Sequence, residues 1–103
     1  MFTFQDEEKH MCLIYASTPP QEYMQQTRSI RLNGAVTSIR LEMRFWSILE
    51  RISQQENTTI GRFLSTLHNE ATSIHGEIDN FASLLRVVCT TSLEPQLAEQ
   101  ATA

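Results

Sequence analysis

Two polar side chains, Ser38 and Arg40, lie two residues apart in an alternating stretch, residues 37–42. Positions i and i+2 of a strand point to the same face, so both would project together, with Ile39 and Leu41 on the opposite face. A two-stranded ribbon fits the major groove of B-DNA, which is about 12 Å wide, and an arginine fork matches the edge of guanine. Ser38 and Arg40 are therefore candidate base-contacting residues.

A second candidate contact is the start of a helical pattern at Ile60. Thr59 can cap this helix, and Gly61 would let another backbone approach closely. The N–H groups at a helix N-terminus bind phosphate readily. Thr59, Ile60 and Gly61 thus form a candidate phosphate clamp.

Other chemistries find little support in the sequence. His68 and His75 would lie about 10 Å apart along a helix, too far to share a metal ion, and we expect both at the surface. Cys12 and Cys89 lack zinc-binding spacing, and we expect them to be buried and reduced. No glycine-rich loop or nucleophile motif is present. We predict no enzyme activity, no metal and no cofactor.

Charge is unevenly distributed along the chain, whose formal net charge is −4. Residues 28–68 hold six arginines against three glutamates, a net +3, and the remainder holds two basic against nine acidic residues, a net −7. The basic centre favours a phosphate-bearing partner, although these arginines could equally solvate a surface. With no membrane-length apolar run and no secretory pattern, we predict a cytoplasmic protein that does not enter membranes.

The elements that position these residues can be read from turn signals. Asn33-Gly34 between two alternating runs predicts a type I′ hairpin. The pairs expected across it are Leu32 with Ala35, Ile30 with Thr37, and Arg28 with Ile39. The opposite face would carry Ser29, Arg31, Val36, Ser38 and Arg40.

Helical patterns follow the hairpin. The first covers residues 43–55 behind a weak cap at Glu42, and Asn57 can end it in a left-handed conformation. The second covers residues 60–71, and its apolar stripe continues to Ile74. The third is capped by Asp79 or Asn80, carries its own apolar stripe, and ends at Pro95. Its stripe consists of Phe81, Leu84, Leu85, Val88 and Cys89.

Upstream of the hairpin the patterns are short. Residues 12–16 are an apolar run that fits a strand or a buried helix equally well. Residues 20–26 can form a short helix that begins with proline. Farther along, Phe45 and Trp46 could stack on a base, but adjacent aromatic residues on an apolar stripe favour the core.

Together these features resemble the ribbon-helix-helix family, the Arc/MetJ type of bacterial DNA-binding dimers. Residues 39–42 and the helix containing Phe45, Trp46, Leu49 and Ile52 match its strand and first helix. Residues 57–59 match its turn, and residues 60–68 its second helix. Residues 80–87 resemble the extra C-terminal helix of a bacterial subfamily.

The resemblance implies an α+β, mostly helical fold that assembles as an intertwined homodimer. Residues 28–93 would form the ribbon-helix-helix domain with its third helix. Residues 1–27 would be an N-terminal extension with a short strand and a short helix, and residues 94–103 a flexible tail. The expected dimer core is Ile39, Leu41, Phe45, Trp46, Leu49, Ile52, Phe63, Leu64 and Leu67.

The resemblance also implies transcription regulation at a pseudo-palindromic double-stranded DNA operator. Val36, Ser38 and Arg40 would read bases, and Thr59, Ile60 and Gly61 would hold phosphate. Val36 is apolar, however, and outer strands would make a ribbon too wide for the groove. Either Arg28 and Arg31 form a DNA-contacting arm, or the sheet binds protein, as in an antitoxin or adaptor dimer.

Overall fold

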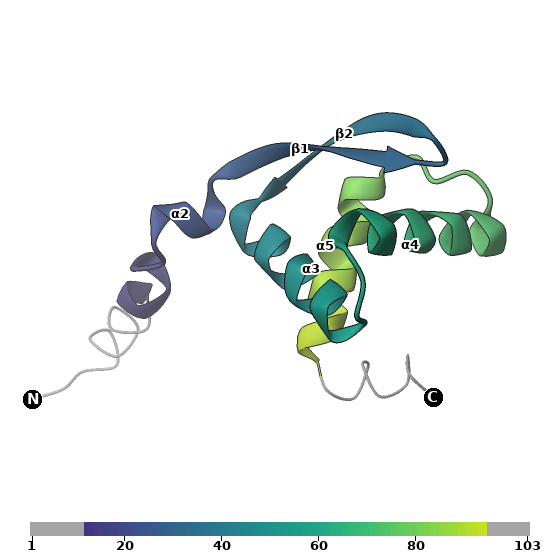
Figure 1. The fold of residues 1–103 in the computed structure, drawn as a ribbon. Coiled ribbons are helices and arrows are strands. Elements are labelled where there is room, and N and C mark those ends of the chain that lie inside the picture. Colours follow the sequence, from purple (N-terminus) through teal and green to yellow (C-terminus); the bar gives the residue numbers. More distant parts are fainter. Residues whose placement is uncertain (1–11, 95–103) are drawn as a thin grey trace, which may run out of the picture.

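A computed structural model describes residues 12–94 of the chain. Its elements are, in order, α2 (Pro20–Tyr23), β1 (Gln25–Leu32), β2 (Ala35–Glu42), α3 (Met43–Gln55), α4 (Ile60–His75) and α5 (Phe81–Leu93). The hairpin lies across one side of the three long helices, and the N-terminal segment extends away from them (Figure 1). The predicted α+β, mostly helical chain with a hairpin and three helices is confirmed. Within residues 12–94, every helix is too short or too polar to cross a membrane.

The hairpin has the predicted turn and register. Asn33 and Gly34 both have positive φ, 53° and 83°, which the type I′ turn requires at its two central positions. β1 and β2 pair antiparallel along their whole length, from Leu32 opposite Ala35 to Gln25 opposite Glu42. Because side chains alternate along each strand, the turn fixes which residues face the helices.

The inward face of the hairpin supplies part of one apolar core. Ile39 and Leu41 of β2 are 4% and 0% exposed, and Ile30 and Leu32 of β1 are also buried. The helices contribute the remaining buried members, Trp46, Ile48, Leu49, Leu64, Leu85 and Cys89. Phe45, Ile52, Phe63 and Leu67 are only partly buried and pack at the margin of this core.

The helix ends follow the sequence signals. Glu42 is the N-cap of α3 without a side-chain cap bond, and the Met43 N–H instead donates to the Met24 carbonyl at 2.8 Å. Asn57 has a φ of 56° after α3. Thr59 accepts from the Arg62 N–H at the start of α4, and Asn80, one of the two predicted caps, accepts from Ser83 at the start of α5.

Upstream of the hairpin, the predictions need correction. The helix expected over residues 20–26 ends at Tyr23, because Gln25 and Gln26 pair with β2. Residues 12–16 are helical and exposed, neither a strand nor a buried helix. Cys12 is therefore exposed, and only Cys89 is buried as expected. Of the expected tail, residues 95–103 lie outside the described residues.

Two expectations about α4 also need correction. Ile74 continues the apolar stripe but is 74% exposed, and the C-terminal end of α4 extends beyond the turn of the hairpin (Figure 1). His68 is not a free surface residue. It is half-buried, and its ring meets Phe81 edge to face at a centroid distance of 5.0 Å.

Candidate nucleic-acid interface

The outer face of the hairpin carries the three predicted base-reading residues. Val36, Ser38 and Arg40 are all exposed, and Ser38 and Arg40 alternate with the buried residues Ile39 and Leu41. β1 adds further polar side chains to the same face, because Thr27, Ser29 and Arg31 stand opposite Arg40, Ser38 and Val36. The face therefore presents two guanidinium groups and three hydroxyls, a set rich in hydrogen-bond donors.

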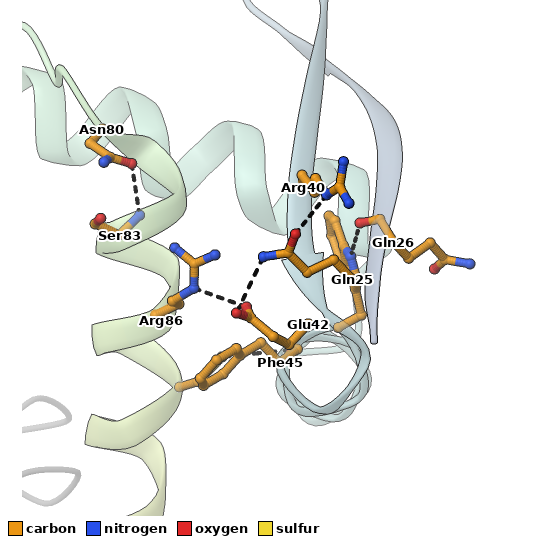
Figure 2. A network of polar contacts seen from close by, with 10 residues as sticks. Gln25, Gln26, Arg40, Glu42, Phe45, Asn80, Ser83 and Arg86 are labelled. Carbon is orange, nitrogen blue, oxygen red and sulfur yellow. Dashed lines mark hydrogen bonds and ion pairs between the residues drawn. The ribbon is translucent and has the colours of Figure 1, made fainter. Parts of the chain in front are cut away.

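One carboxylate lies at the end of this face, and it is paired. Arg86 of α5 donates from Nε to Glu42 Oε1 at 3.0 Å, and Gln25 donates to Oε2 (Figure 2). The backbone N–H of Glu42, and then Arg86 and Gln25, lower the pKa of this carboxyl, while burial opposes them. The negative charge of Glu42 is thus balanced by Arg86, and a second carboxylate, that of Asp79, lines a cavity beside Ser38 and Arg40.

Arg28, one of the two candidate residues for a DNA-contacting arm, is held by contacts within the chain. It lies within β1 and faces the helices, where Nη1 is 2.7 Å from Glu50 Oε1 and the guanidinium carbon is 4.7 Å from the centre of the Trp46 ring. Its Nε donates to the Gln26 side chain. These contacts hold Arg28 to the fold, and residues 28–32 form part of strand β1.

Arg31 lies beside the predicted phosphate clamp. Its Nη1 donates to the Gly34 carbonyl in the turn at 3.1 Å, and a shallow groove of about 360 Å³ separates the turn from the start of α4. Arg31, Asn33, Gly34, Gly61, Arg62, Ser65 and Thr66 line it. The groove has two guanidinium groups and no acidic side chain. The structure thus brings Arg31 and Gly61, expected at separate sites, to one basic surface.

Gly61 itself has room around it. A Cβ at this position would meet nothing within 4 Å, so packing within the chain does not require glycine. Thr59 is the N-cap, with its hydroxyl accepting from the Arg62 N–H at 3.2 Å. Ile60 is partly buried against the core, which leaves its backbone and not its side chain available to a ligand.

The aromatic residues that could have stacked on a base belong to the interior. Trp46 is completely buried, and its Nε1 donates to the Gln26 carbonyl at 2.8 Å. Phe45 is partly buried at the margin of the core. Neither ring is presented on the outer face.

Several residues of this region were missed from the sequence. Arg62, Ser65 and Thr66 follow the i, i+3, i+4 spacing of one helix face, a signal that could have identified them. Gln25 and Arg86 meet Glu42 from 17 and 44 residues away in the chain, and no local pattern indicates such contacts. His, Cys, Asp and Glu side chains within residues 12–94 form no group of three that could hold a metal ion.

The arrangement of hairpin and helices matches a known family. A family model described as a ribbon-helix-helix domain matches residues 25–93, which comprise β1 through α5. The chain belongs to the ribbon-helix-helix family. Ribbon-helix-helix domains are typically DNA-binding modules without enzyme activity.

A solved structure shows the same ribbon-helix-helix arrangement. An uncharacterized protein from Bordetella pertussis Tohama I is 36% identical to this chain and superposes with a TM-score of 0.81. The match covers 86% of this chain and 71% of that protein. The comparison with curated proteins gives no match.

Proposed function

We propose that this ribbon-helix-helix protein is a homodimeric transcription regulator that binds double-stranded DNA sequence-specifically through the outer face of its hairpin. The observation that best supports this proposal is the composition of that face. Arg31 and Arg40 stand among three hydroxyl side chains, and the nearby carboxylate of Glu42 is paired with Arg86. Guanidinium and hydroxyl groups are the donors that read base edges and hold phosphates.

The free edge of β2 supports assembly as a dimer. Leu32 and Ala35 flank the turn as a hydrogen-bonded pair, so by alternation Val36, Ser38 and Arg40 direct their backbone groups away from β1. Within residues 12–94, no backbone hydrogen bond covers that edge. A strand edge with unpaired backbone groups can form hydrogen bonds with another strand. We infer that β2 of a second copy pairs antiparallel here, which gives the two-fold symmetry that a pseudo-palindromic operator requires.

The partly exposed margin of the core agrees with this assembly. Phe45, Ile52, Phe63 and Leu67 remain partly exposed around the core. A second copy would cover these side chains, as the expected dimer core requires.

The width of the resulting sheet assigns different roles to the two strands. Four strands at the usual spacing place the outer pair about 14 Å apart, more than the groove width of about 12 Å. We therefore infer that only β2 enters the groove, where Val36, Ser38 and Arg40 contact bases. β1 would lie at the rim, where Arg31 and the clamp formed by Thr59, Ile60 and Gly61 face phosphates.

Selection from random double-stranded DNA by the purified protein, at fixed and stated salt, tests this function. We expect enrichment of an inverted repeat. Arg40→Ala should cost about 1–3 kcal/mol of binding free energy per half-site and relax the preference at one base in each. Arg51→Ala removes the same charge from an exposed position of α3 and should keep the preference at every base. Failure to enrich any sequence would refute the proposal.

Gly61→Ala tests the phosphate clamp separately. The new Cβ meets nothing within the chain and replaces a poor helix former by a good one, so the variant should be at least as stable as the wild type. A DNA backbone close to Gly61 would nevertheless collide with it. We expect weaker binding to all sequences alike, and unchanged binding would remove Gly61 from the interface.

A second function, docking of a protein partner, is favoured by one observation. Leu13, Ile14, Tyr15, Tyr23 and Met24, ahead of the hairpin, are 59–73% exposed. Exposed apolar clusters commonly mark interaction sites. An antitoxin or adaptor role through this segment predicts that Leu13→Ser with Tyr15→Ser abolishes partner binding without changing any DNA preference.

A further inference from the structure

A chain of side-chain contacts joins α5 to the outer face of the hairpin (Figure 2). Arg86 Nε donates to Glu42 Oε1 at 3.0 Å, and Gln25 Nε2 donates to Glu42 Oε2 at 3.5 Å. Gln25 Oε1 in turn accepts from Arg40 Nε at 2.7 Å. These four residues come from α5, β1 and β2, so the contacts form only after the helices and hairpin have packed together.

The two neighbours of Gln25 determine how its amide is oriented. An amide offers an acceptor oxygen on one side and donor N–H groups on the other. Arg40 carries only donors and the Glu42 carboxylate only acceptors. A flipped amide would set donor against donor and acceptor against acceptor, so Glu42 fixes the amide with its oxygen toward Arg40.

The contact with Gln25 leaves the two Nη groups of Arg40 available to bind a base. Only Nε of the guanidinium is engaged, and among the described residues its two Nη groups have no partner. An arginine can donate two parallel hydrogen bonds to O6 and N7 of guanine. With Nε held from the side of Gln25, the plane of the guanidinium is constrained while its Nη groups stay free to bind.

We propose that Gln25 is a positioning residue for Arg40, and that Glu42 and Arg86 hold Gln25 in turn, which orients the guanidinium to read guanine. This inference rests on the proposed function. It gives β1 a part in specificity without a base contact of its own, and it makes recognition depend on the docking of α5. Holding Arg40 before DNA arrives reduces the ordering required on binding, because long side chains otherwise lose rotamer freedom at an interface.

Gln25→Ala, with Gln26→Ala as its matched control, tests the inference. Gln26 is the adjacent residue of β1 and also accepts from an arginine Nε, that of Arg28 at 2.8 Å, but on the other face. Gln25→Ala should weaken binding to the selected DNA by about 2- to 12-fold per half-site, mainly by reducing the guanine preference at the base read by Arg40. Gln26→Ala should leave affinity and preference unchanged.

A double-mutant cycle separates positioning from a direct contact with DNA. Once Arg40 is replaced by alanine, Gln25→Ala should cause no further loss of affinity. Additive losses would overturn the positioning role. Arg86→Met, which keeps the apolar stem but removes the contact with Glu42, should give a smaller loss at the same base. Melting temperatures should show that each variant is folded.

A measurement without DNA tests the contact itself. In NMR spectra, the Arg40 Nε–H should exchange with water more slowly than that of exposed Arg51. The exchange should become as fast as for Arg51 in Gln25→Ala but not in Gln26→Ala. Equal exchange in wild type and Gln25→Ala would overturn the inference whatever the DNA result. A wild-type protein that shows the slow exchange but selects no DNA would refute the proposed function alone.

Discussion

Replacement of Trp46 by phenylalanine tests how the hairpin is fastened to α3. The indole is fully buried, its Nε1 donates to the Gln26 carbonyl of β1 at 2.8 Å, and the Arg28 guanidinium lies over the ring. Phenylalanine keeps an aromatic ring in the core but removes all of the hydrogen bond and part of the stacking. The variant should therefore loosen β1 specifically.

The expected loss in the free energy of unfolding is the sum of the contributions of these contacts. Loss of the hydrogen bond removes about 0.5–1.5 kcal/mol of net stability, and a weaker interaction with the partly exposed arginine removes at most about 1 kcal/mol. The smaller ring also buries two fewer carbon atoms, worth about 0.8 kcal/mol each. The free energy of unfolding should fall by about 2–4 kcal/mol, a large share of the roughly 5–15 kcal/mol typical of a domain.

Urea unfolding followed by far-ultraviolet circular dichroism measures this loss. Fluorescence is unsuitable, because Trp46 is the single tryptophan of the chain. All variants must be compared at one protein concentration, since an oligomer gains stability with concentration. In a cycle with Arg28→Met, Trp46→Phe should cost about 0.5–1 kcal/mol less once the guanidinium is gone. A cost below about 0.5 kcal/mol for Trp46→Phe alone would refute the anchoring role.

Three further predictions concern the apolar core, the reactivity of the two thiols and the dependence of stability on pH. Leu85→Ala, at a fully buried position of α5, should lower the free energy of unfolding by about 2–5 kcal/mol in the same urea experiment. Burial raises the pKa of the Cys89 thiol to about 11, whereas Cys12 is exposed, so a thiol reagent should label one cysteine per chain natively and two after denaturation. Because the backbone N–H of Glu42, and then Arg86 and Gln25, lower the pKa of its carboxyl on folding, the ionised carboxylate stabilises the protein above the ordinary value of 4.5, and this gain is lost as the pH falls below it. The difference in melting temperature between wild type and Glu42→Gln should shrink between about pH 6 and pH 3.

The local architecture was largely predictable from the sequence. Asn33-Gly34 specified both the turn and the register, because this dipeptide accepts positive φ at both positions, and every pair expected across the hairpin is present. The caps at Thr59 and Asn80 depend only on nearby side chains. Such features follow from interactions within a few residues, which a sequence displays directly.

Features that depend on distant partners were not predictable. Arg28 was a candidate for a DNA-contacting arm, and its engagement by Glu50 and Trp46 requires α3 to fold back under β1. Ile74 continues a regular apolar stripe, yet its side chain is 74% exposed, and the spacing alone gives no sign of this. The contacts through Gln25 span three elements, so no spacing rule could have shown them.

The direct junction of β2 and α3 limits how this chain can vary in length. Glu42 is both the last residue of β2 and the N-cap of α3, so no linker separates the strand from the helix. One inserted residue between Glu42 and Met43 would turn the helix by about 100° relative to the strand and carry Trp46 away from Gln26. Insertions and deletions should consequently be tolerated in the loop before Phe81, and excluded at the junction.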